Sequence, residues 1–464
     1  SGKSGRVSVD AGGAEVLARS GCVVHDDRLE LRFRVGLPAK GRSILGRAAA
    51  GLLARDLPRA LEAVRWASLD AEEVREQVLL VEDHHHLRDA LAGRGLVAFV
   101  RDGSILPRSS GVSSEPLEGA VPFESPASLR VTLPTLHHGD VTGMGVPEGV
   151  TLLVGGGFHG KTTLLEALQL GVYPHVPGDG REWVVTRADA VKVRSEDGRS
   201  VADVDLRPFI HDLPRGRSTA SFRTPDASGS TSLAAGILES MELGAGALLM
   251  DEDTCATNLL VRDARMQRLV QHETIVPLID RVRELHRDHG VSTVLALGGS
   301  GDYLEVADTV VMMDAYLPHD VTARGREVAA EVPTGRAEEA SRPPLAVTER
   351  CPVGRSFDAR AGKRERVRSR GTRELTLGRE TIELSAVEQL VDDSQVRAIG
   401  ALLKRAHRVA DGDTTLASLV AALIAHVERE GWVAVDDSPE LAMPRALEVG
   451  AAINRLRALR VSQS

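Results

Sequence analysis

The sequence predicts an α/β fold, in which a mixed and mainly parallel sheet is covered by helices and flanked by α+β units. Three observations lead to this prediction. Apolar runs alternate with helix-like patterns between residues 129 and 330, which is typical of parallel strands joined by helices. A Gly-rich turn connects one of these runs directly to a helix pattern. The composition changes on both sides, with Pro and Ser clustering before this region and Arg clustering after it.

These changes of composition divide the chain into four parts. We expect an N-terminal α+β domain at residues 1–128, the α/β core at 129–330, a linker at 331–350 and a small C-terminal α+β domain at 351–464. The chain has 464 residues, of which 42% are apolar, and this is enough for two or three domains with buried cores.

Periodicity predicts the elements of the N-terminal part. Residues 29–35 alternate apolar and charged side chains, as a strand with one open face does. Residues 44–53 and 69–87 repeat apolar side chains at helical spacing. Residues 97–100 and 105–106 suggest a hairpin around a tight Asp-Gly turn.

The core contains five short apolar runs that read as strands. They lie near residues 150–154, 183–186, 247–250, 292–297 and 309–313. In an open sheet of parallel strands, a ligand binds outside the carboxyl ends of the strands. Functional residues are therefore expected directly after these runs.

The first of these strands leads into a phosphate-binding motif. Residues 155–162 read Gly-Gly-Gly-Phe-His-Gly-Lys-Thr, and a helix pattern follows at 162–170. Glycines let backbone N–H groups point at phosphate oxygens, while Lys161 reaches the β- and γ-phosphates and Thr162 holds Mg²⁺. An ordinary Gly-rich turn is the alternative, but the flanking strand and helix favour a phosphate loop. The expected nucleotide-binding residues are Gly155, Gly156, Gly157, Phe158, His159, Gly160, Lys161, Thr162 and Thr163.

An acidic pair ends the strand at residues 247–250. Asp251 and Glu252 suit a site in which Asp251 binds the Mg²⁺ shell and Glu252 polarises the attacking water. Acidic residues also favour the start of a helix, where they interact with the helix dipole. The neighbouring phosphate loop favours the metal site, so Glu252 and Lys161 are the candidate catalytic residues.

A second anion-binding surface is expected between these two motifs. Ser228, Gly229 and Ser230 form a Ser-Gly-Ser turn that leads into a helix pattern at residues 233–241. Hydroxyl groups and backbone N–H groups at the start of a helix bind anions. We therefore add these three residues to the candidate phosphate ligands.

In this order, the motifs resemble the ATP-binding-cassette (ABC) class of ATPases. In that class a Ser-Gly-rich signature opens the helix before the acidic strand, and the signature of one subunit closes over the γ-phosphate held by another. The resemblance implies an ABC-type P-loop ATPase core, ATP, ADP and Mg²⁺ as ligands, and a homodimer. It assigns residues 228–230 to the signature, 256–258 to the loop at the dimer seam and 299–302, with Ser300, to the switch segment.

Two side chains of the class are absent from this sequence. No glutamine occurs between the phosphate-loop helix and the signature, so Asp179 or Glu182 is a candidate metal contact in its place. No histidine occurs in residues 292–317, so Ser300 or Asp302 stands where the class senses the γ-phosphate. The motifs narrow the resemblance to a soluble, mostly bacterial family of predicted ABC-class ATPases. A kinetoplastid mitochondrial relative of this family is tied to RNA editing, which implies RNA as a partner by family relation alone.

The C-terminal part combines a hairpin, three helices and a basic run. Residues 375–384 suggest a hairpin around Gly378, and residues 387–406, 416–427 and 446–459 have amphipathic helix patterns. The basic run carries seven cations against two carboxylates, a net local charge of +5. Arginine contacts phosphates with planar pairs of donors, so this run is the candidate RNA or DNA surface; a solvated charge run is the alternative. Its cations are Arg355, Arg360, Lys363, Arg364, Arg366, Arg368 and Arg370.

Two histidine groups are weaker candidates. Residues 83–86 read Asp-His-His-His, but adjacent histidines rarely converge on one metal ion, so an exposed polar segment is expected. His137 or His138 precedes the core at the place where the ABC class stacks an aromatic ring on adenine. An ordinary loop histidine is the favoured interpretation there.

Whole-chain properties limit the function classes. No apolar run approaches the roughly 20 residues that cross a bilayer, and no signal peptide is recognised, so no membrane partner is expected. The three cysteines are widely spaced, which fits a reducing cytoplasm. A net charge of −9 gives no global attraction to nucleic acid.

The sequence therefore predicts a cytoplasmic, Mg²⁺-dependent ATPase that dimerises and drives binding or remodelling of nucleic acid, RNA in particular. A nucleotide-gated switch that binds protein and no nucleic acid is the main alternative. A small-molecule kinase is a third possibility, but such an enzyme does not need the Ser-Gly-Ser helix before the acidic strand.

Overall fold

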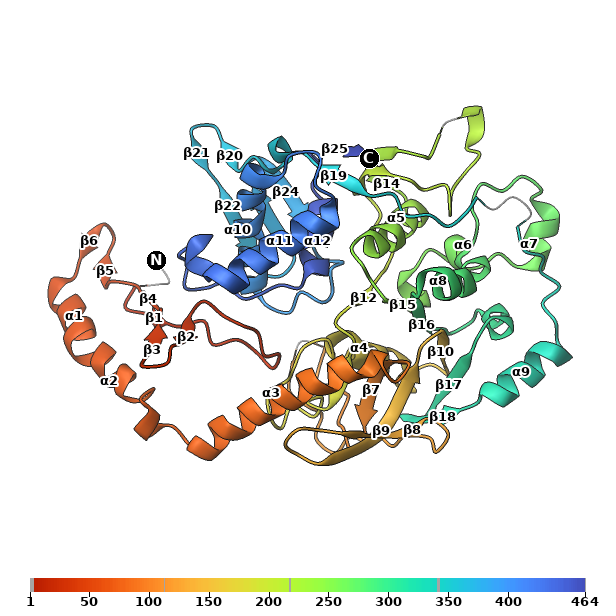
Figure 1. The fold of residues 1–464 in the computed structure, drawn as a ribbon. Helices are drawn as coiled ribbons and strands as arrows, with labels where there is room; N and C mark the ends of the chain where they lie inside the picture. The colour runs from red at the N-terminus through yellow and green to blue at the C-terminus, as the bar shows by residue number, and fades with distance from the viewer. Residues whose placement is uncertain (1–3, 112, 217, 340–342, 464) are drawn as a thin grey trace.

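The structure, a computed structural model, describes residues 4–111, 113–216, 218–339 and 343–463. A six-stranded sheet in the order β12-β15-β16-β10-β17-β18 forms the core (Figure 1). All neighbours are parallel except β17 and β18, which pair antiparallel, so the predicted mixed and mainly parallel sheet is confirmed. The strands are β10 (Val150–Val154), β12 (Ala190–Lys192), β15 (Ala247–Asp251), β16 (Ser292–Ala296), β17 (Thr309–Asp314) and β18 (Leu317–Asp320).

Helices cover both faces of this sheet because neighbouring strand residues point to opposite sides. Leu153 belongs to the apolar cluster that contains α4 (Lys161–Leu170). Leu152 belongs to the opposite cluster, which contains α5 (Gly229–Glu242) and α8 (Val282–His289). Further helices in this region are α6 (Thr257–Leu260), α7 (Ala264–Leu269) and α9 (Thr322–Glu331), and a hairpin of β13 (Arg199–Val204) and β14 (Phe222–Ala227) precedes α5.

A second, antiparallel sheet packs on the far side of α4. Its order is β11-β7-β9-β8, and α3 (Ala71–Ala92) also contacts it. The strands are β7 (Leu96–Arg101), β8 (Arg130–Pro134), β9 (Asp140–Pro147) and β11 (Val184–Thr186).

This second sheet corrects two predictions. Residues 105–106 do not pair with β7 as a hairpin, because β7 is already bonded on both sides by β9 and β11. The strand expected near residues 183–186 exists as β11, but it joins the second sheet; β12 takes the place next to β15. The domain limit at residue 128 falls between β7 and β8, two strands of one sheet, and the four domain limits stay predictions.

The N-terminal residues form short elements rather than one long strand. The expected strand at residues 29–35 is interrupted, because β3 (Leu29–Leu31) pairs with β2 (Cys22–Val24) and β4 (Arg34–Val35) pairs with β1 (Val7–Ser8). A small hairpin of β5 (Ala39–Lys40) and β6 (Ser43–Ile44) follows. The helical stretch continues through α1 (Gly46–Gly51), a π-helical turn and α2 (Leu57–Glu62), which lie at the outer edge of the molecule in Figure 1.

The C-terminal part is a separate layer of one small sheet against three helices. The sheet order is β22 (Val367–Arg370), β23 (Glu374–Leu377) and β24 (Glu380–Glu383), and the predicted hairpin around Gly378 is confirmed. The helices are α10 (Asp393–Val409), α11 (Leu416–Glu430) and α12 (Ala446–Asn454). The first begins later than expected because Asp392 caps it. Two short pairs complete the domain: β19 (Arg350–Pro352) with β25 (Val461–Gln463), and β20 (Arg360–Ala361) with β21 (Arg364–Glu365).

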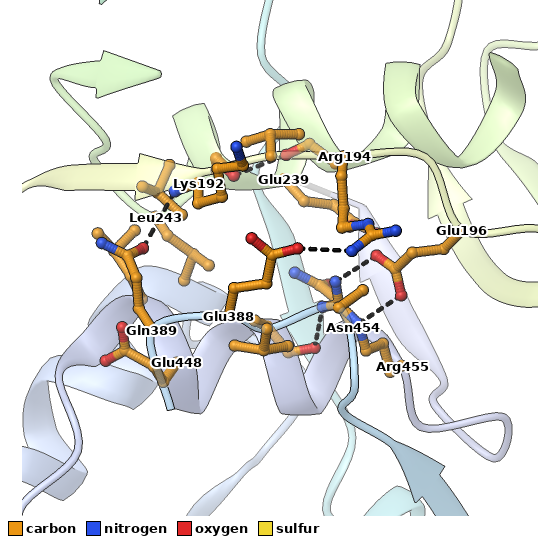
Figure 2. A pocket seen from close by; sticks show the side chains of 18 of the residues that line it. Lys192, Arg194, Glu196, Glu239, Leu243, Glu388, Gln389, Glu448, Asn454 and Arg455 are labelled. Carbon is orange, nitrogen blue, oxygen red and sulfur yellow. Dashed lines mark hydrogen bonds and ion pairs between the residues drawn. The ribbon is translucent and has the colours of Figure 1, made fainter. Parts of the chain in front are cut away.

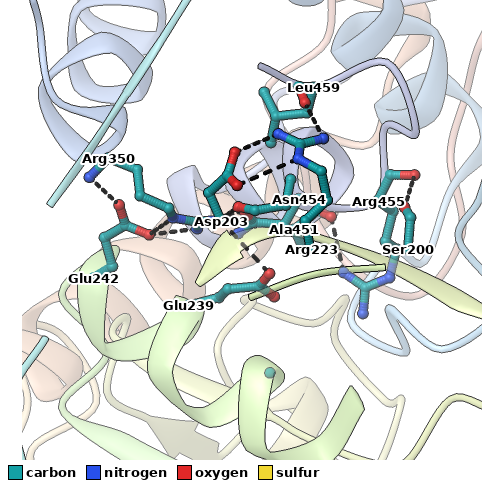
Figure 3. A network of polar contacts seen from close by, with 12 residues as sticks. Ser200, Asp203, Arg223, Glu239, Glu242, Arg350, Ala451, Asn454, Arg455 and Leu459 are labelled. Carbon is teal, nitrogen blue, oxygen red and sulfur yellow. Dashed lines mark hydrogen bonds and ion pairs between the residues drawn. The ribbon is translucent and has the colours of Figure 1, made fainter. Parts of the chain in front are cut away.

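Polar contacts attach this C-terminal layer to the core. Arg350 is 1% exposed; its guanidinium donates to Ala202 O at 2.8 Å and Asn454 Oδ1 at 2.7 Å and is ion-paired with Glu242 (Figure 3). Arg223, which precedes the signature, donates to Leu459 O at 2.9 Å. These contacts join α5, β13 and β14 to the strand β19, the helix α12 and the loop that follows α12. Within the described ranges, no helix has the length and apolarity needed to cross a membrane.

Candidate nucleotide-binding site

The phosphate loop requires glycine at its first position. Gly155 has a φ of +136°, and a Cβ built there would lie 2.3 Å from Met313 O in the neighbouring strand. Gly160, with a φ of +98°, turns the chain into α4. Nothing lies within 4 Å of a Cβ at Gly157. Both ends of the loop therefore require glycine. The positive φ acts at Gly155 and Gly160, and the close approach to β17 acts at Gly155 as well.

Lys161 lies over the loop that it follows. Its Nζ donates to Gly155 O at 2.6 Å and to Gly156 O at 2.9 Å, so the ammonium group is held above the phosphate-binding turn. The backbone N–H groups at the start of α4 add the positive end of the helix dipole. This arrangement places a cation and a set of donors where an anion would enter.

Thr162 and Asp251 bring two oxygen ligands together at the carboxyl edge of the sheet. Thr162 Oγ1 lies 3.4 Å from Asp251 Oδ2. Two neighbouring ligands of an octahedral Mg²⁺, each about 2.1 Å from the ion, lie roughly 3 Å apart. Hydroxyl and carboxylate oxygens are also the chemistry that Mg²⁺ prefers. The two residues therefore fit the predicted metal site.

The switch segment holds Glu252 from the other side. Glu252 Oε2 accepts hydrogen bonds from the N–H groups of Gly298, at 2.6 Å, and Gly299, at 2.9 Å, and Ser300 Oγ donates to Oε1. Burial raises the pKa of Glu252, but these donors outweigh it and hold the pKa below the usual value for a glutamate. Glu252 is therefore a carboxylate at neutral pH, with its position set by residues 298–300.

A cleft of about 670 Å³ gathers most of the predicted site residues. Lys161, Thr162 and Asp251 line it together with the whole Gly-rich turn, and Phe158 projects from its rim with a 98% exposed side chain. Glu252 lies next to this cleft, held against the Gly298 backbone that lines it. The site residues from four separate stretches of sequence thus meet at the carboxyl ends of β10, β15 and β16.

The signature residues lie outside this cleft but at the same edge of the sheet. Ser228 caps α5, and its Oγ accepts from Thr231 N at 3.4 Å. Because α5 ends where β15 begins, its first turn lies at the carboxyl edge, as does the first turn of α4. Ser230 Oγ donates to Asn258 Oδ1 at 2.7 Å, which joins the signature to the expected dimer-seam loop. The phosphate loop and the signature therefore lie at the same edge of the sheet, but the signature residues do not line the cleft of their own chain.

The structure does not place the alternative metal and adenine candidates in the cleft. Asp179 is buried and bonded to Arg108 and His175, and neither Asp179 nor Glu182 lines the cleft. His138 Nδ1 bonds Asp83 Oδ2 at 2.5 Å, and neither His137 nor His138 lines the cleft.

The Asp-His-His-His segment is only partly exposed, contrary to the sequence-based expectation. Asp83 and His84 are buried because they face the antiparallel sheet and α4, where His84 Nε2 bonds Gly171 O at 3.1 Å. Among the residues that the structure describes, no group of three or more His, Cys, Asp or Glu is arranged to hold a metal ion.

The sequence analysis did not predict a role for the segment that follows β12. Ser195 Oγ accepts from Ala256 N at 2.7 Å, and a Cβ at Gly229 would lie 3.4 Å from Asp197 Oδ1. The segment thus supports both the acidic strand's loop and the signature. A strand of three residues, Ala-Val-Lys, gives too short an apolar pattern to be recognised in the sequence.

The same segment contacts the C-terminal domain. Figure 2 shows Arg194 facing Glu388 and Arg455 facing Glu196 around a small cavity. Arg194 Nη1 donates to Glu388 Oε1 at 2.5 Å, and Arg455 Nε donates to Glu196 Oε2 at 3.0 Å. Arg457 donates to Pro225 O at 2.6 Å, three residues before the signature. The C-terminal domain is therefore in direct contact with the surroundings of the signature.

The fold and the site have the features of the P-loop class of nucleotide-binding domains. Comparison with family models is more specific: the P-loop domain of the ABC-class ATPases matches residues 70–350, which is more than half of the chain. The N-terminal domain of ATPases of the ABC class matches residues 1–67, and the MRB1590 C-terminal domain matches residues 366–462. The chain belongs to the ABC-class ATPase family, which confirms the predicted resemblance and its relation to the kinetoplastid protein.

One similar protein is itself uncharacterized, so the similarity assigns no function to this chain. The uncharacterized protein MJ1628 of Methanocaldococcus jannaschii is 30% identical over 238 residues. The match covers 47% of this chain and 52% of the relative, so this chain spans about half the length of the relative that it matches.

Proposed function

We propose that this chain binds Mg·ATP and hydrolyses it to ADP and phosphate. The observation that carries this proposal is the meeting of Lys161, the Thr162–Asp251 oxygen pair and Glu252 at one edge of the sheet. Such an arrangement supplies a cation for the phosphates, ligands for a metal ion and a carboxylate for water.

Each side chain has a separate task in this reaction. Lys161 would leave its two carbonyl partners and neutralise the β- and γ-phosphates. Thr162 and Asp251 would hold Mg²⁺, which when bound neutralises charge on the phosphate oxygens. Glu252 is ionised and can accept a hydrogen bond from the attacking water. Ser300 acts as a positioning residue, because it holds Glu252 and lies at the predicted γ-phosphate-sensing position.

We propose that two copies of the chain form the complete site. Ser228, Gly229 and Ser230 lie outside the cleft of their own chain, although they form a helix N-terminus suited to phosphate. A two-fold pair that places each signature over the partner's γ-phosphate would complete both sites at once. ATP then acts as the contact between subunits, and hydrolysis releases them.

Two variants separate binding from hydrolysis. Lys161→Ala should lose ATP binding and turnover, whereas Glu252→Gln should bind ATP and lose turnover by about 100-fold or more, since positioned acid–base groups contribute roughly 10²–10⁴-fold. Glu331→Gln, an exposed carboxylate on α9, is the matched control and should behave as the wild type. Full ATPase activity in Lys161→Ala would refute the assignment of the phosphate loop.

We further propose that ATP turnover drives the binding or remodelling of RNA in the cytoplasm. The support is an exposed row of arginines on the edge strand β22 and the turn before it: Arg366, Arg368 and Arg370 alternate with the inward-facing Val367 and Ser369. Within the described ranges, no carboxylate lies within 4.0 Å of these three guanidinium groups. The match to the MRB1590 C-terminal domain covers this strand.

Charge reversal tests the proposed RNA surface. The triple variant Arg366→Glu, Arg368→Glu, Arg370→Glu should weaken binding of a random RNA oligonucleotide and reduce its dependence on salt, since released counterions carry that dependence. Arg429→Glu, on the exposed end of α11, is the control. If the wild type binds neither RNA nor DNA while its ATPase is intact, the alternative stands, which is a nucleotide-gated switch that binds protein.

A further inference from the structure

An apolar pocket of about 250 Å³ adjoins the phosphate cleft and has no assigned role. Gly160, Thr163 and Tyr316 line both the pocket and the phosphate cleft, so the two spaces are continuous. The remaining wall is apolar and comes mostly from residues 106–107 and 117–123, which precede the core. That wall consists of Leu106, Pro107, Leu117, Gly119, Ala120, Val121, Phe123 and Met313.

Tyr316 stands at the junction of the two spaces in an uncommon backbone conformation. Ala315 and Tyr316 have φ values of +45° and +71°, and bulky residues rarely adopt such values outside sites where the structure imposes them. The ring is 57% exposed, and its Cδ1 atom would lie 3.5 Å from a Cβ at Gly160. The turn between β17 and β18 thus presents a partly exposed aromatic ring beside the phosphate loop.

His159 fixes this turn to the phosphate loop. Its Nδ1 accepts a hydrogen bond from Ala315 N at 3.0 Å and lies 3.0 Å from Asp314 Oδ1. The loop that carries His159 and the turn that carries Tyr316 are therefore held at a set separation. A ligand that extends from the phosphate loop into the pocket would contact both this loop and the turn that carries Tyr316.

The opposite wall is also anchored. Arg108 Nη2 donates to Asp179 Oδ2 at 2.7 Å, and Arg181 Nε donates to Leu106 O at 2.8 Å. Gly103 and Ser104 exchange backbone hydrogen bonds with Phe123 at 2.7 and 2.9 Å, which closes the loop on itself. Leu117 and Val121 line the pocket and remain 42% and 44% exposed, although the chain around them is held by these hydrogen bonds.

We propose that this pocket takes the purine base of the nucleotide whose phosphates the Gly-rich loop holds, with Tyr316 against the face of the base. A base has two apolar faces that gain from leaving water, and aromatic side chains stack on them. The pocket joins the phosphate cleft at Gly160 and Thr163, so a nucleotide held by the phosphate loop would enter the pocket there. Residues 106–107 and 117–123 are then part of the nucleotide site.

The lining also determines how the base is recognised. Among the described residues that line the pocket, Thr163 and Tyr316 carry the polar side-chain groups, and both groups are hydroxyls. None of the described residues that line the pocket carries a carboxylate or a side-chain amide, the groups that would distinguish the edges of adenine from those of guanine. Stacking and shape therefore dominate, and ATP and GTP should bind with affinities within about tenfold of each other.

Binding of ATP, GTP and inorganic tripolyphosphate by calorimetry tests this assignment on the full chain. Tyr316→Ala and Val121→Asp should each weaken ATP binding by about tenfold or more and leave tripolyphosphate binding unchanged. Tyr316→Phe keeps the ring and should bind ATP as the wild type does. Val433→Asp, which charges a 59% exposed valine in the C-terminal domain, is the control for Val121→Asp.

The outcomes distinguish this inference from the proposed function on which it rests. If Lys161→Ala binds both ATP and tripolyphosphate normally, the phosphate-loop assignment fails and the base pocket fails with it. If Lys161→Ala loses both ligands but Tyr316→Ala and Val121→Asp bind ATP normally, the base lies elsewhere and only this inference is overturned. A preference for ATP over GTP above tenfold would overturn recognition by stacking and shape.

Discussion

Loss of one buried guanidinium should destabilise the attachment of the C-terminal domain. In Arg350→Met, Glu242 keeps a side chain that is 4% exposed but loses its ion pair (Figure 3). Burial already raises the pKa of Glu242, and Arg350 is the main opposing influence. Removing one partner of a buried pair costs about 3–5 kcal/mol, because it leaves an uncompensated charge. Two hydrogen bonds, to Ala202 O and Asn454 Oδ1, are lost as well.

Urea unfolding followed by tryptophan fluorescence measures this loss. The double variant Arg350→Met, Glu242→Leu removes the stranded charge and should regain most of the stability, since apolar replacements of buried pairs are often neutral. Arg360→Met breaks an exposed ion pair with Asp358 and should leave the unfolding midpoint unchanged. A loss below about 1 kcal/mol in Arg350→Met, or no recovery in the double variant, would refute the reasoning.

Three further predictions concern the nucleotide site. Gly155→Ala should abolish ATP binding, because its Cβ would lie 2.3 Å from Met313 O, whereas Gly157→Ala has open space and should bind normally in the same filter-binding assay. Ser300→Ala removes a donor that lowers the pKa of Glu252, so that pKa rises and the acid limb of the ATPase pH profile should move to higher pH; an unmoved limb would argue against the contact. EDTA should stop turnover and Mg²⁺ restore it, and Thr162→Ala should need about tenfold more Mg²⁺ for half-maximal rate; normal turnover in EDTA would exclude the metal site.

The strand β10, the helix α4 and the phosphate loop between them were predictable because each depends on neighbours in the sequence. Val150–Val154 and Lys161–Leu170 show this: a buried strand needs a run of apolar residues and the following helix needs glycine at its entry. The acidic pair was equally visible, since it ends the buried apolar strand β15. These features need no knowledge of the tertiary structure.

Features that depend on contacts between residues far apart in the sequence could not be predicted from local patterns. The strand at residues 184–186 has a core-like pattern, yet its partner is β7, which lies more than eighty residues earlier. Tyr316 lies in a turn between two strands, and only folding brings residues 106–107 and 117–123 against it. The contact of Ser300 with Glu252 likewise forms across two strand ends. The burial of Asp83 and His84 also depends on how α3 packs against the rest of the molecule, and a run of polar residues gives no sign of this packing in the sequence.

We propose that ATP joins two copies of this chain, with the phosphate loop of one copy facing the signature of the other. Light scattering of Glu252→Gln with and without ATP tests it most directly, with Lys161→Ala as the control. We expect ATP to double the mass of Glu252→Gln and to leave Lys161→Ala monomeric. If Glu252→Gln binds ATP and remains monomeric, the signature does not act on a partner and the chain is a solitary P-loop switch.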